Sequence, residues 1–185
     1  MTVPLHVAFV AGTSGAWAIS DIVCVAGETL PRAKALAVHE GSSSAYRADD
    51  ATWVLRGVVS NERYVTRQER DALESRQQPL GRRSATRAVL IPVRKSPQWW
   101  ALTQDERREI FEERSRHIGI GIMALPEVAR RLHHSRDLGE PFDFLTWFEF
   151  APEHAGIFDG VLTELRATDE WRYVDREVEI RLDRR

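Results

Sequence analysis

The feature that most constrains the fold is a repeated switch between strand-like and helix-like periodicity, which occurs in a similar order in two halves of the chain. The halves meet near the proline-containing stretch IPVRKSPQWW, so residues 1–97 form a shortened N-terminal half and residues 98–185 a C-terminal half. A chain of 185 residues can bury one sizeable core but not two large independent ones. We therefore expect one compact unit built from two similar halves.

The N-terminal half carries β-branched and aromatic residues in short segments that are typical of strands. The charged run TRQERDALESRQQ, which begins at Thr66, predicts a short exposed helix. The predicted strands are Val3–Val10, Trp17–Val25, Trp53–Ser60 and Ala88–Lys95, and the predicted turns are Gly12–Gly15 and Gly41–Ser44.

The C-terminal half opens with Thr103 and Glu106 in capping-box spacing, and apolar residues then recur near helical period as far as Leu125. This pattern predicts one long amphipathic helix. Pro126 predicts the first turn of a second helix, EVARRLHHSRDL, which Gly139 would end. The remaining predicted elements are a strand with alternating phenylalanines at residues 142–150, a helix after Pro152 and a closing strand over Val174–Leu182.

The order of these elements favours an α+β fold, with an antiparallel sheet covered by helices on one side, over a doubly wound parallel sheet. Neither GxGxxG nor GxxxxGK[ST] occurs in the chain, so the sequence does not support nucleotide-phosphate binding.

Charge and hydropathy indicate which kinds of partner the chain can bind. The 26 basic and 28 acidic residues nearly balance, which argues against nucleic acid and favours a small ligand. No run approaches the roughly 18 uncharged apolar residues that a membrane helix needs. The opening MTVPLHVAFVAG lacks the basic region of a signal peptide and is typical of a first strand, so we expect a cytoplasmic protein without a membrane partner.

His117 is the first candidate for chemistry. It lies beside the apolar stripe of the predicted long helix, where an imidazole needs a polar partner or a metal. A second histidine at HExxH spacing is missing, but a haem iron needs only one protein ligand. Cys24 is the only cysteine and no CxxCH occurs, so any haem would be held non-covalently. The residues alone leave a structural histidine and a haem ligand both open.

The basic residues after Pro126 are the second candidates. Either Arg130 or Arg131 could face into a closed pocket and hold an anion beside a metal; otherwise the two form an exposed basic face. His133 and His134 are adjacent on the predicted helix, so we expect at most one of them to point inward.

Trp99 and Trp100 follow Lys95 closely and offer flat apolar surface near a cation. This combination suits a macrocycle that bears carboxylates. Two core tryptophans and a solvated lysine would explain the same residues.

A long segment of the chain closely resembles the haem-binding half of chlorite dismutases: KSPQWWALTQDERREIFEERSRHIGIGIMALPEVARRLHHSRDLGEPFDFLTWFEF, residues 95–150. The resemblance continues through RATDEWRYVDREVEIRL and includes the earlier LRGVVSNERYVTR, so it covers most of the chain from about Val54. The short N-terminal half is similar to that of the compact, dimeric lineage. The resemblance implies ferredoxin-like repeats that form an antiparallel β-barrel covered by helices, a dimeric α+β barrel, and a homodimer.

The resemblance also implies roles for single residues. His117, in SRHIGIG, matches the proximal ligand of one non-covalent haem b per chain, and Glu170, in TDEWRYV, matches the carboxylate that accepts its other ring N–H. Arg130 matches the distal arginine of active dismutases. The residues that match the haem lining or its propionate contacts are Lys95, Trp99, Trp100 and Tyr64, and Gln77, or its neighbour Gln78, matches a loop glutamine near the distal arginine.

The implied activity is the conversion of the chlorite anion to chloride and dioxygen, with hypochlorite as a transient leaving group held by Arg130. Coproheme decarboxylase is similar in fold but carries glutamine at the distal position, so Arg130 argues against it. A haem sensor or carrier would use the same residues and differ only in activity. A cofactor-free barrel of this fold would leave the matched residues unexplained.

The run GIFDG at residues 156–160 matches the GxxDG signature of dye-decolourising peroxidases, which are relatives of the same family. We expect this match to be accidental, because Asp159 should point outward from the helix after Pro152.

Overall fold

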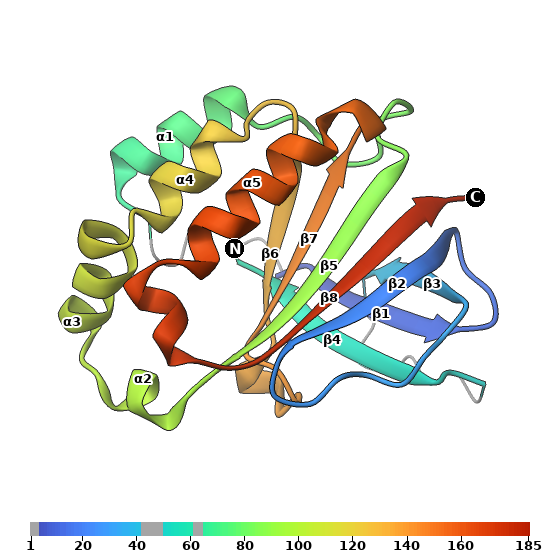
Figure 1. Ribbon diagram of the computed structural model, residues 1–185, viewed down its shortest axis with the longest axis horizontal. Helices are drawn as coiled ribbons and strands as arrows, with labels where there is room; N and C mark the ends of the chain where they lie inside the picture. The colour runs from blue at the N-terminus through green and yellow to red at the C-terminus, as the bar shows by residue number, and fades with distance from the viewer. Residues whose placement is uncertain (1–3, 42–49, 61–64) are drawn as a thin grey trace.

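The computed structural model describes residues 4–41, 50–60 and 65–185. Its strands are β1 (His6–Gly12), β2 (Trp17–Ala26), β3 (Ala35–Glu40), β4 (Trp53–Val59), β5 (Arg87–Lys95), β6 (Ala129–His134), β7 (Phe144–Phe150) and β8 (Val174–Arg184). They close into an antiparallel barrel in the order β1-β3-β2-β8-β5-β7-β6-β4 (Figure 1). The predicted α+β class, with an antiparallel barrel, is confirmed.

The helices are α1 (Arg67–Arg76), α2 (Pro97–Ala101), α3 (Gln104–Arg108), α4 (His117–Met123) and α5 (Ala155–Arg166). A π-helical turn spans Glu109–Arg114, and 3₁₀ turns span Arg136–Leu138, Pro152–His154 and Asp169–Tyr173. Helices α1, α4 and α5 lie together over one side of the barrel, as predicted (Figure 1). Within the described ranges, no helix is long and apolar enough to cross a membrane.

Local signals account for most of the N-terminal half. Strands β1, β2, β4 and β5 overlap the four predicted strands. Helix α1 begins after Thr66, whose Oγ1 accepts from the Glu69 amide at 3.3 Å while the Glu69 carboxylate accepts from the Thr66 amide at 2.7 Å. The turn predicted at Gly41–Ser44 lies mostly outside the described residues, and the division of the chain at residue 97 stays a prediction.

Strand β3 was not predicted. Its sequence, ALAVHE, is short and does not alternate between apolar and polar residues. It is a strand because it pairs along its whole length with β1, from Val7 opposite Glu40 to Gly12 opposite Ala35. Tertiary pairing, rather than local preference, determines its conformation.

The helix predicted after Pro126 is wrong: half of that segment is strand β6, and only a 3₁₀ turn follows it. The strand pairs with β7 from Ala129 opposite Glu149 to His134 opposite Phe144, and with β4 at two further positions. These ladders close the barrel, and their hydrogen bonds and burial override a weak local helix preference. His133 and His134 are both buried but lie on opposite faces of the strand. His133 packs on Phe9 inside the barrel and His134 on Phe144 on the outer face, so only one of the two points into the barrel, as expected.

The single long helix predicted before Pro126 is interrupted. Thr103 and Glu106 form the expected capping box at α3, but the chain then passes through the π-helical turn Glu109–Arg114. Arg116 adopts a left-handed conformation, with φ 52° and ψ 35°. The chain therefore changes direction directly before His117, which becomes the first residue of α4 and does not lie in the middle of a continuous helix.

The barrel has a core on each side of its wall. Inside, the largest buried side chains include Phe9, Trp147, Leu90 and Ile180. Outside, a second cluster joins the strands β5 and β7 to α5, where Phe158 packs against Phe148 and Phe150 at ring-centroid distances of 5.1 and 4.9 Å. Strands β5 and β7 are therefore largely apolar on both faces where α5 covers them.

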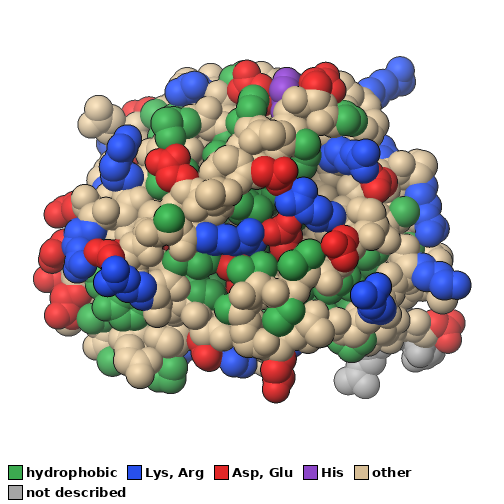
Figure 2. Space-filling model, viewed as in Figure 1, with side chains coloured by type: hydrophobic (Ala, Val, Ile, Leu, Met, Phe, Trp, Pro, Cys, Tyr) green, Lys and Arg blue, Asp and Glu red, His purple; other side chains and the backbone are tan. Residues whose placement is uncertain are grey.

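Ion pairs join α5 to β8 across the surface. Arg181 lies 2.7 Å from Asp159, and Arg166 lies 2.6 Å from the fully buried Glu177. Acidic and basic side chains accordingly intersperse over this face of the molecule and do not gather by sign (Figure 2). Asp159 is exposed and paired with Arg181, which confirms the expectation that the aspartate of GIFDG points outward.

Candidate active site

A cavity of about 430 Å³ lies between the outer face of the barrel and the helices that cover it. Its floor is formed by alternate residues of three neighbouring strands, because successive side chains of a strand point to opposite faces. The register places Leu132 opposite Thr146 and Thr146 opposite Ile91, so their side chains share this face. The floor residues are Ile91, Val93, Arg130, Leu132, Phe144, Thr146 and Phe148.

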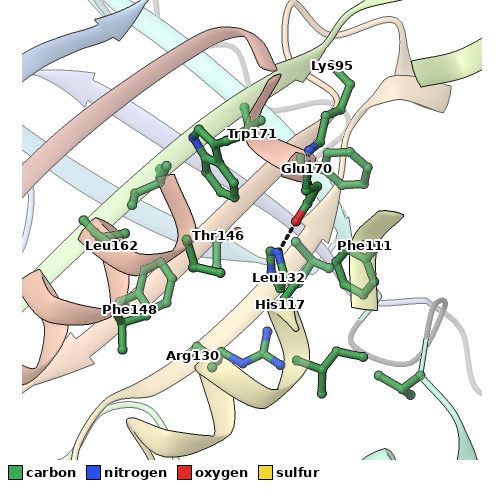
Figure 3. Close-up of a pocket in the computed structure, with 18 of the residues that line it drawn as sticks. Lys95, Phe111, His117, Arg130, Leu132, Thr146, Phe148, Leu162, Glu170 and Trp171 are labelled. Atoms are coloured by element: carbon green, nitrogen blue, oxygen red, sulfur yellow. Dashed lines mark hydrogen bonds and ion pairs between the residues drawn. The ribbon is translucent and has the colours of Figure 1, made fainter. Parts of the chain in front are cut away.

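The walls come from the covering segments and are also largely apolar. They include Phe111 of the π-helical turn, Ile118 of α4, and Phe158, Leu162 and Leu165 of α5. Polar and charged side chains also line the cavity, Arg107 and Arg108 among them. Those at its centre are His117, Glu170 and Arg130 (Figure 3).

His117 and Glu170 form the closest polar pair in the cavity. The Nδ1 atom of His117 lies 2.6 Å from Oε2 of Glu170 (Figure 3). Glu170 belongs to the 3₁₀ turn Asp169–Tyr173, and its backbone amide donates to Oγ of the buried Ser115 at 3.0 Å. The turn that carries Glu170 is thus tied to the residues directly before His117.

Lys95, the last residue of β5, is the second side chain that contacts the Glu170 carboxylate. Its Nζ donates to Oε1 of Glu170 at 2.7 Å and lies 4.7 and 5.3 Å from the ring centroids of Trp99 and Trp171. Burial alone would raise the pKa of Glu170, but the charges of His117 and Lys95, together with the hydrogen bonds from both, lower that pKa to about 2. Glu170 is therefore ionised at neutral pH.

An ionised Glu170 determines which ring nitrogen of His117 carries the proton. Since the carboxylate only accepts, Nδ1 must donate, and the lone pair of the neutral imidazole is on Nε2. Phe111 stacks on the imidazole at a centroid distance of 4.5 Å and Trp171 lies parallel to it at 6.2 Å. The ring is therefore held at one nitrogen and along its face, and Nε2 is the atom suited to a metal.

The protein offers such a metal a single ligand. Among the described residues, no group of three or more histidine, cysteine, aspartate or glutamate side chains could hold a metal ion. Iron at His117 would need its other ligands from a macrocycle, as in haem. The mostly apolar cavity fits a flat macrocycle of that kind.

Arg130 is the cation of the cavity floor. Its Nε atom is buried and has no hydrogen-bond partner in the part of the chain that the structure describes. Burial lowers the pKa of the guanidinium, which nevertheless stays charged because arginine is so basic. A buried charge without a partner favours an anion in the same cavity. The next residue, Arg131, faces away: its Nε lies 3.1 Å from His133 Nε2, and its guanidinium pairs with Glu40 at 2.6 Å.

The structure brings some of the other predicted residues to the cavity and not others. Trp99 lines it, and Trp99 Nε1 is buried without a partner among the described residues. Trp100 does not line it; its indole donates to Asp143 at 3.2 Å and stacks on Phe144. Gln77 is half-buried at the end of α1 and Gln78 is exposed, and neither lines the cavity. Tyr64 lies outside the described residues.

Sequence reasoning missed Phe111, Thr146 and Trp171, which also line the cavity. Thr146 interrupts the aromatic run FDFLTWFEF as a small polar residue, and Trp171 directly follows Glu170. These positions offered a weak signal. The stacking of Phe111 on His117 could not be foreseen, because it depends on the break in the helix.

Comparisons with known proteins agree with this geometry. The family model described as chlorite dismutase matches residues 20–185. A crystal structure of dimeric chlorite dismutases from Nitrobacter winogradskyi is 54% identical, covers 97% of this chain and 99% of that chain, and superposes with a TM-score of 0.88.

More distant relatives point the same way. The chlorite dismutase of Ideonella dechloratans is 34% identical over 86 residues, which are 46% of this chain and only 28% of that protein. A mutant chlorite dismutase from Candidatus Nitrospira defluvii, 18% identical, shares the fold with a TM-score of 0.69 over 100% of this chain and 93% of that chain. From the family match along residues 20–185 and the near-complete likeness to the Nitrobacter structure, we conclude that this chain belongs to the chlorite dismutase family.

Proposed function

We propose that the chain binds one non-covalent haem b through His117 and converts chlorite to chloride and dioxygen. The observation that carries the proposal is the pairing of His117 with the buried Glu170 in an apolar cavity that also contains the unpartnered Nε of Arg130. When bound, the haem supplies the redox chemistry that cleaves the Cl–O bonds of chlorite and joins the two oxygen atoms.

On this proposal, His117 binds the iron through Nε2. Glu170 keeps the proton on Nδ1 and makes the imidazole a stronger electron donor. Lys95 offsets the charge of Glu170 and so allows the carboxylate to stay ionised although it is buried. Lys95 thus serves mainly to pair with Glu170, and only the ammonium protons that do not bond to Glu170 are available to a haem propionate.

Arg130 would hold the anions. Chlorite and hypochlorite each carry one negative charge, and a guanidinium in a desolvated cavity binds such an anion far more strongly than in water. By keeping hypochlorite in the cavity, Arg130 favours its recombination over its escape. The buried Nε1 of Trp99 is suited to donate to a haem propionate.

The likeness to dimeric chlorite dismutases from Nitrobacter winogradskyi supports a homodimer. A cytoplasmic location and the absence of a nucleic-acid partner stay predictions.

The test is oxygen evolution. Chlorite is added to the haem-loaded protein on an oxygen electrode, beside the variants His117→Ala and Arg130→Ala. We expect prompt oxygen release by the wild type, loss of haem and oxygen in His117→Ala, and retained haem with weak oxygen release in Arg130→Ala. A haem spectrum without oxygen release from the wild type would contradict the dismutase assignment and favour a haem sensor, a carrier or a decarboxylase.

A further inference from the structure

The chain breaks its helix directly before His117, and the break leaves backbone amides that need partners. The first amides of any helix have no acceptor within the helix, and a Ser, Thr, Asp or Asn at the N-cap usually supplies one. The N-cap of α4 is Arg116, whose side chain makes no capping hydrogen bond.

Glu112, from the preceding π-helical turn, takes the place of the missing cap. One of its carboxylate oxygens accepts from the Ile118 amide at 2.6 Å and the other from the Gly119 amide at 3.3 Å. The Glu112 carbonyl also accepts from the Arg116 amide at 2.8 Å, so Glu112 bonds to both sides of the break. A carboxylate is well placed there, because the N-terminus of a helix carries partial positive charge.

These bonds surround His117 in the chain. Arg116 precedes it and Ile118 and Gly119 follow it, and all three amides are held by Glu112. The neighbouring Phe111 stacks on the His117 ring from the same turn. The ring contacts fix the tilt of the imidazole, whereas the Glu112 bonds fix the backbone from which the side chain leaves.

We infer that Glu112 is a positioning residue for His117: its carboxylate holds the start of α4 so that Nε2 of His117 points into the cavity. The role of Glu112 toward the iron rests on the proposed function, in which His117 binds a haem. Glu112 would act through the backbone of His117, without touching the haem or the substrate.

The experiment compares the wild type with Glu112→Ala, Glu112→Gln and the matched control Glu113→Gln, all as isolated with haem. Glu113 is exposed in the same turn, and the substitution Glu113→Gln removes the same charge as Glu112→Gln does. Two quantities are measured: hydrogen exchange of the amides at residues 117–123, and the iron–histidine stretching band of the ferrous protein.

In Glu112→Ala we expect the amides of Ile118 and Gly119 to exchange about five- to tenfold faster, as for the loss of a helix cap. We also expect the iron–histidine band to shift or broaden. Glu112→Gln keeps one acceptor oxygen and should lie between the wild type and Glu112→Ala, which also serves as the test if the alanine variant folds poorly. Glu113→Gln should match the wild type in both quantities.

An unchanged iron–histidine band in Glu112→Ala, despite faster exchange, would overturn the inference, because Glu112 would then stabilise α4 without positioning His117. Unchanged exchange would overturn it as well. If the wild type lacks the band altogether, the haem assignment itself has failed. The ring N–H proton resonance of His117 then decides: its loss in Glu112→Ala supports the positioning role, and its persistence contradicts it.

Discussion

Nδ1 of His117 lies 2.6 Å from Oε2 of Glu170, although 53 positions separate the two residues in the chain. The contact joins the start of α4 to the 3₁₀ turn that precedes β8, and Lys95 of β5 approaches the same carboxylate from its other side. Three distant segments thus meet at one carboxylate, which determines the tautomer of the histidine.

The substitution Glu170→Gln should weaken the iron–imidazole bond, because an amide stabilises the Nδ1 proton less than a carboxylate does. We expect a lower iron–histidine stretching frequency and a loss of roughly 10- to 100-fold in haem affinity or activity, as is usual for such partners of a metal ligand. Resonance Raman spectra and haem titration measure both. Asp169→Asn, which affects only exposed or half-exposed pairs with Arg114 and Arg172, is the matched control and should change neither.

The substitution Arg130→Lys should keep haem but lower chlorite turnover, since a single ammonium cannot reproduce the planar fork of a guanidinium. A loss on the order of 10²- to 10³-fold is expected if the interaction acts mainly on the transition state. A chlorination trap added during turnover should capture more hypochlorite than it does with the wild type. Arg131→Lys changes the neighbouring arginine on the opposite face and should retain full turnover. Equal turnover and equal trapping in the two variants would rule out the role assigned to Arg130.

Gly57 of β4 should tolerate no side chain. A Cβ at this position would lie 2.6 Å from Cβ of His133 and 3.0 Å from Oγ of Ser135. Gly57→Ala is therefore expected to lower the free energy of unfolding by about 1–3 kcal/mol, as overpacking commonly does. Gly160→Ala is the contrasting variant, because open space surrounds that position in α5; it should raise the same free energy by up to about 1 kcal/mol. Denaturant unfolding of both variants tests the pair.

Acid should destabilise the protein through His133. Burial among the barrel strands lowers the pKa of this histidine from 6.5 to about 4; the hydrogen bond to the Leu145 carbonyl opposes this shift, and the charge of Arg131 adds to it. Between these two pH values the unfolded chain binds more protons than the folded chain, so the free energy of unfolding falls as the pH decreases from 6.5 to 4. At pH 4, His133 is expected to lower the free energy of unfolding by about 3 kcal/mol relative to neutral pH.

An NMR titration of the His133 ring, combined with unfolding at pH 7 and pH 5, measures this effect. The variant His133→Gln should lose this part of the pH dependence while it keeps a polar group for Arg131. A ring that titrates near pH 6.5 in the folded protein would contradict the prediction.

Local sequence pattern was sufficient where an element buries one face in a regular way. The alternating phenylalanines of β7 and the helix after Thr66 are examples, and both elements form where they were predicted. At Thr103 the predicted capping box forms, but the helix that it begins is interrupted. Strand β6 was missed because its conformation is determined by β7 and β4, which lie elsewhere in the sequence.

The candidate site was likewise predictable only in part. The resemblance singled out His117, Glu170 and Arg130, and the structure places all three at one cavity. The sequence could not reveal that Glu112 caps the helix of His117, because the interaction exists only after Arg116 adopts a left-handed conformation. Contacts of this kind depend on the three-dimensional path of the chain and cannot be predicted from sequence periodicity.

The alternation along β6 has a consequence for how this protein can change during evolution. Arg130 faces the cavity and Arg131 faces the barrel interior because of the pairing register with β7. Inserting or deleting one residue within the strand would exchange the two faces, so that Arg130 would leave its place in the cavity and Arg131 would leave the face on which it pairs with Glu40. Length changes in this stretch are therefore selected against twice, for stability and for chemistry. Insertions in the surface turns beyond the strand ends would face neither constraint.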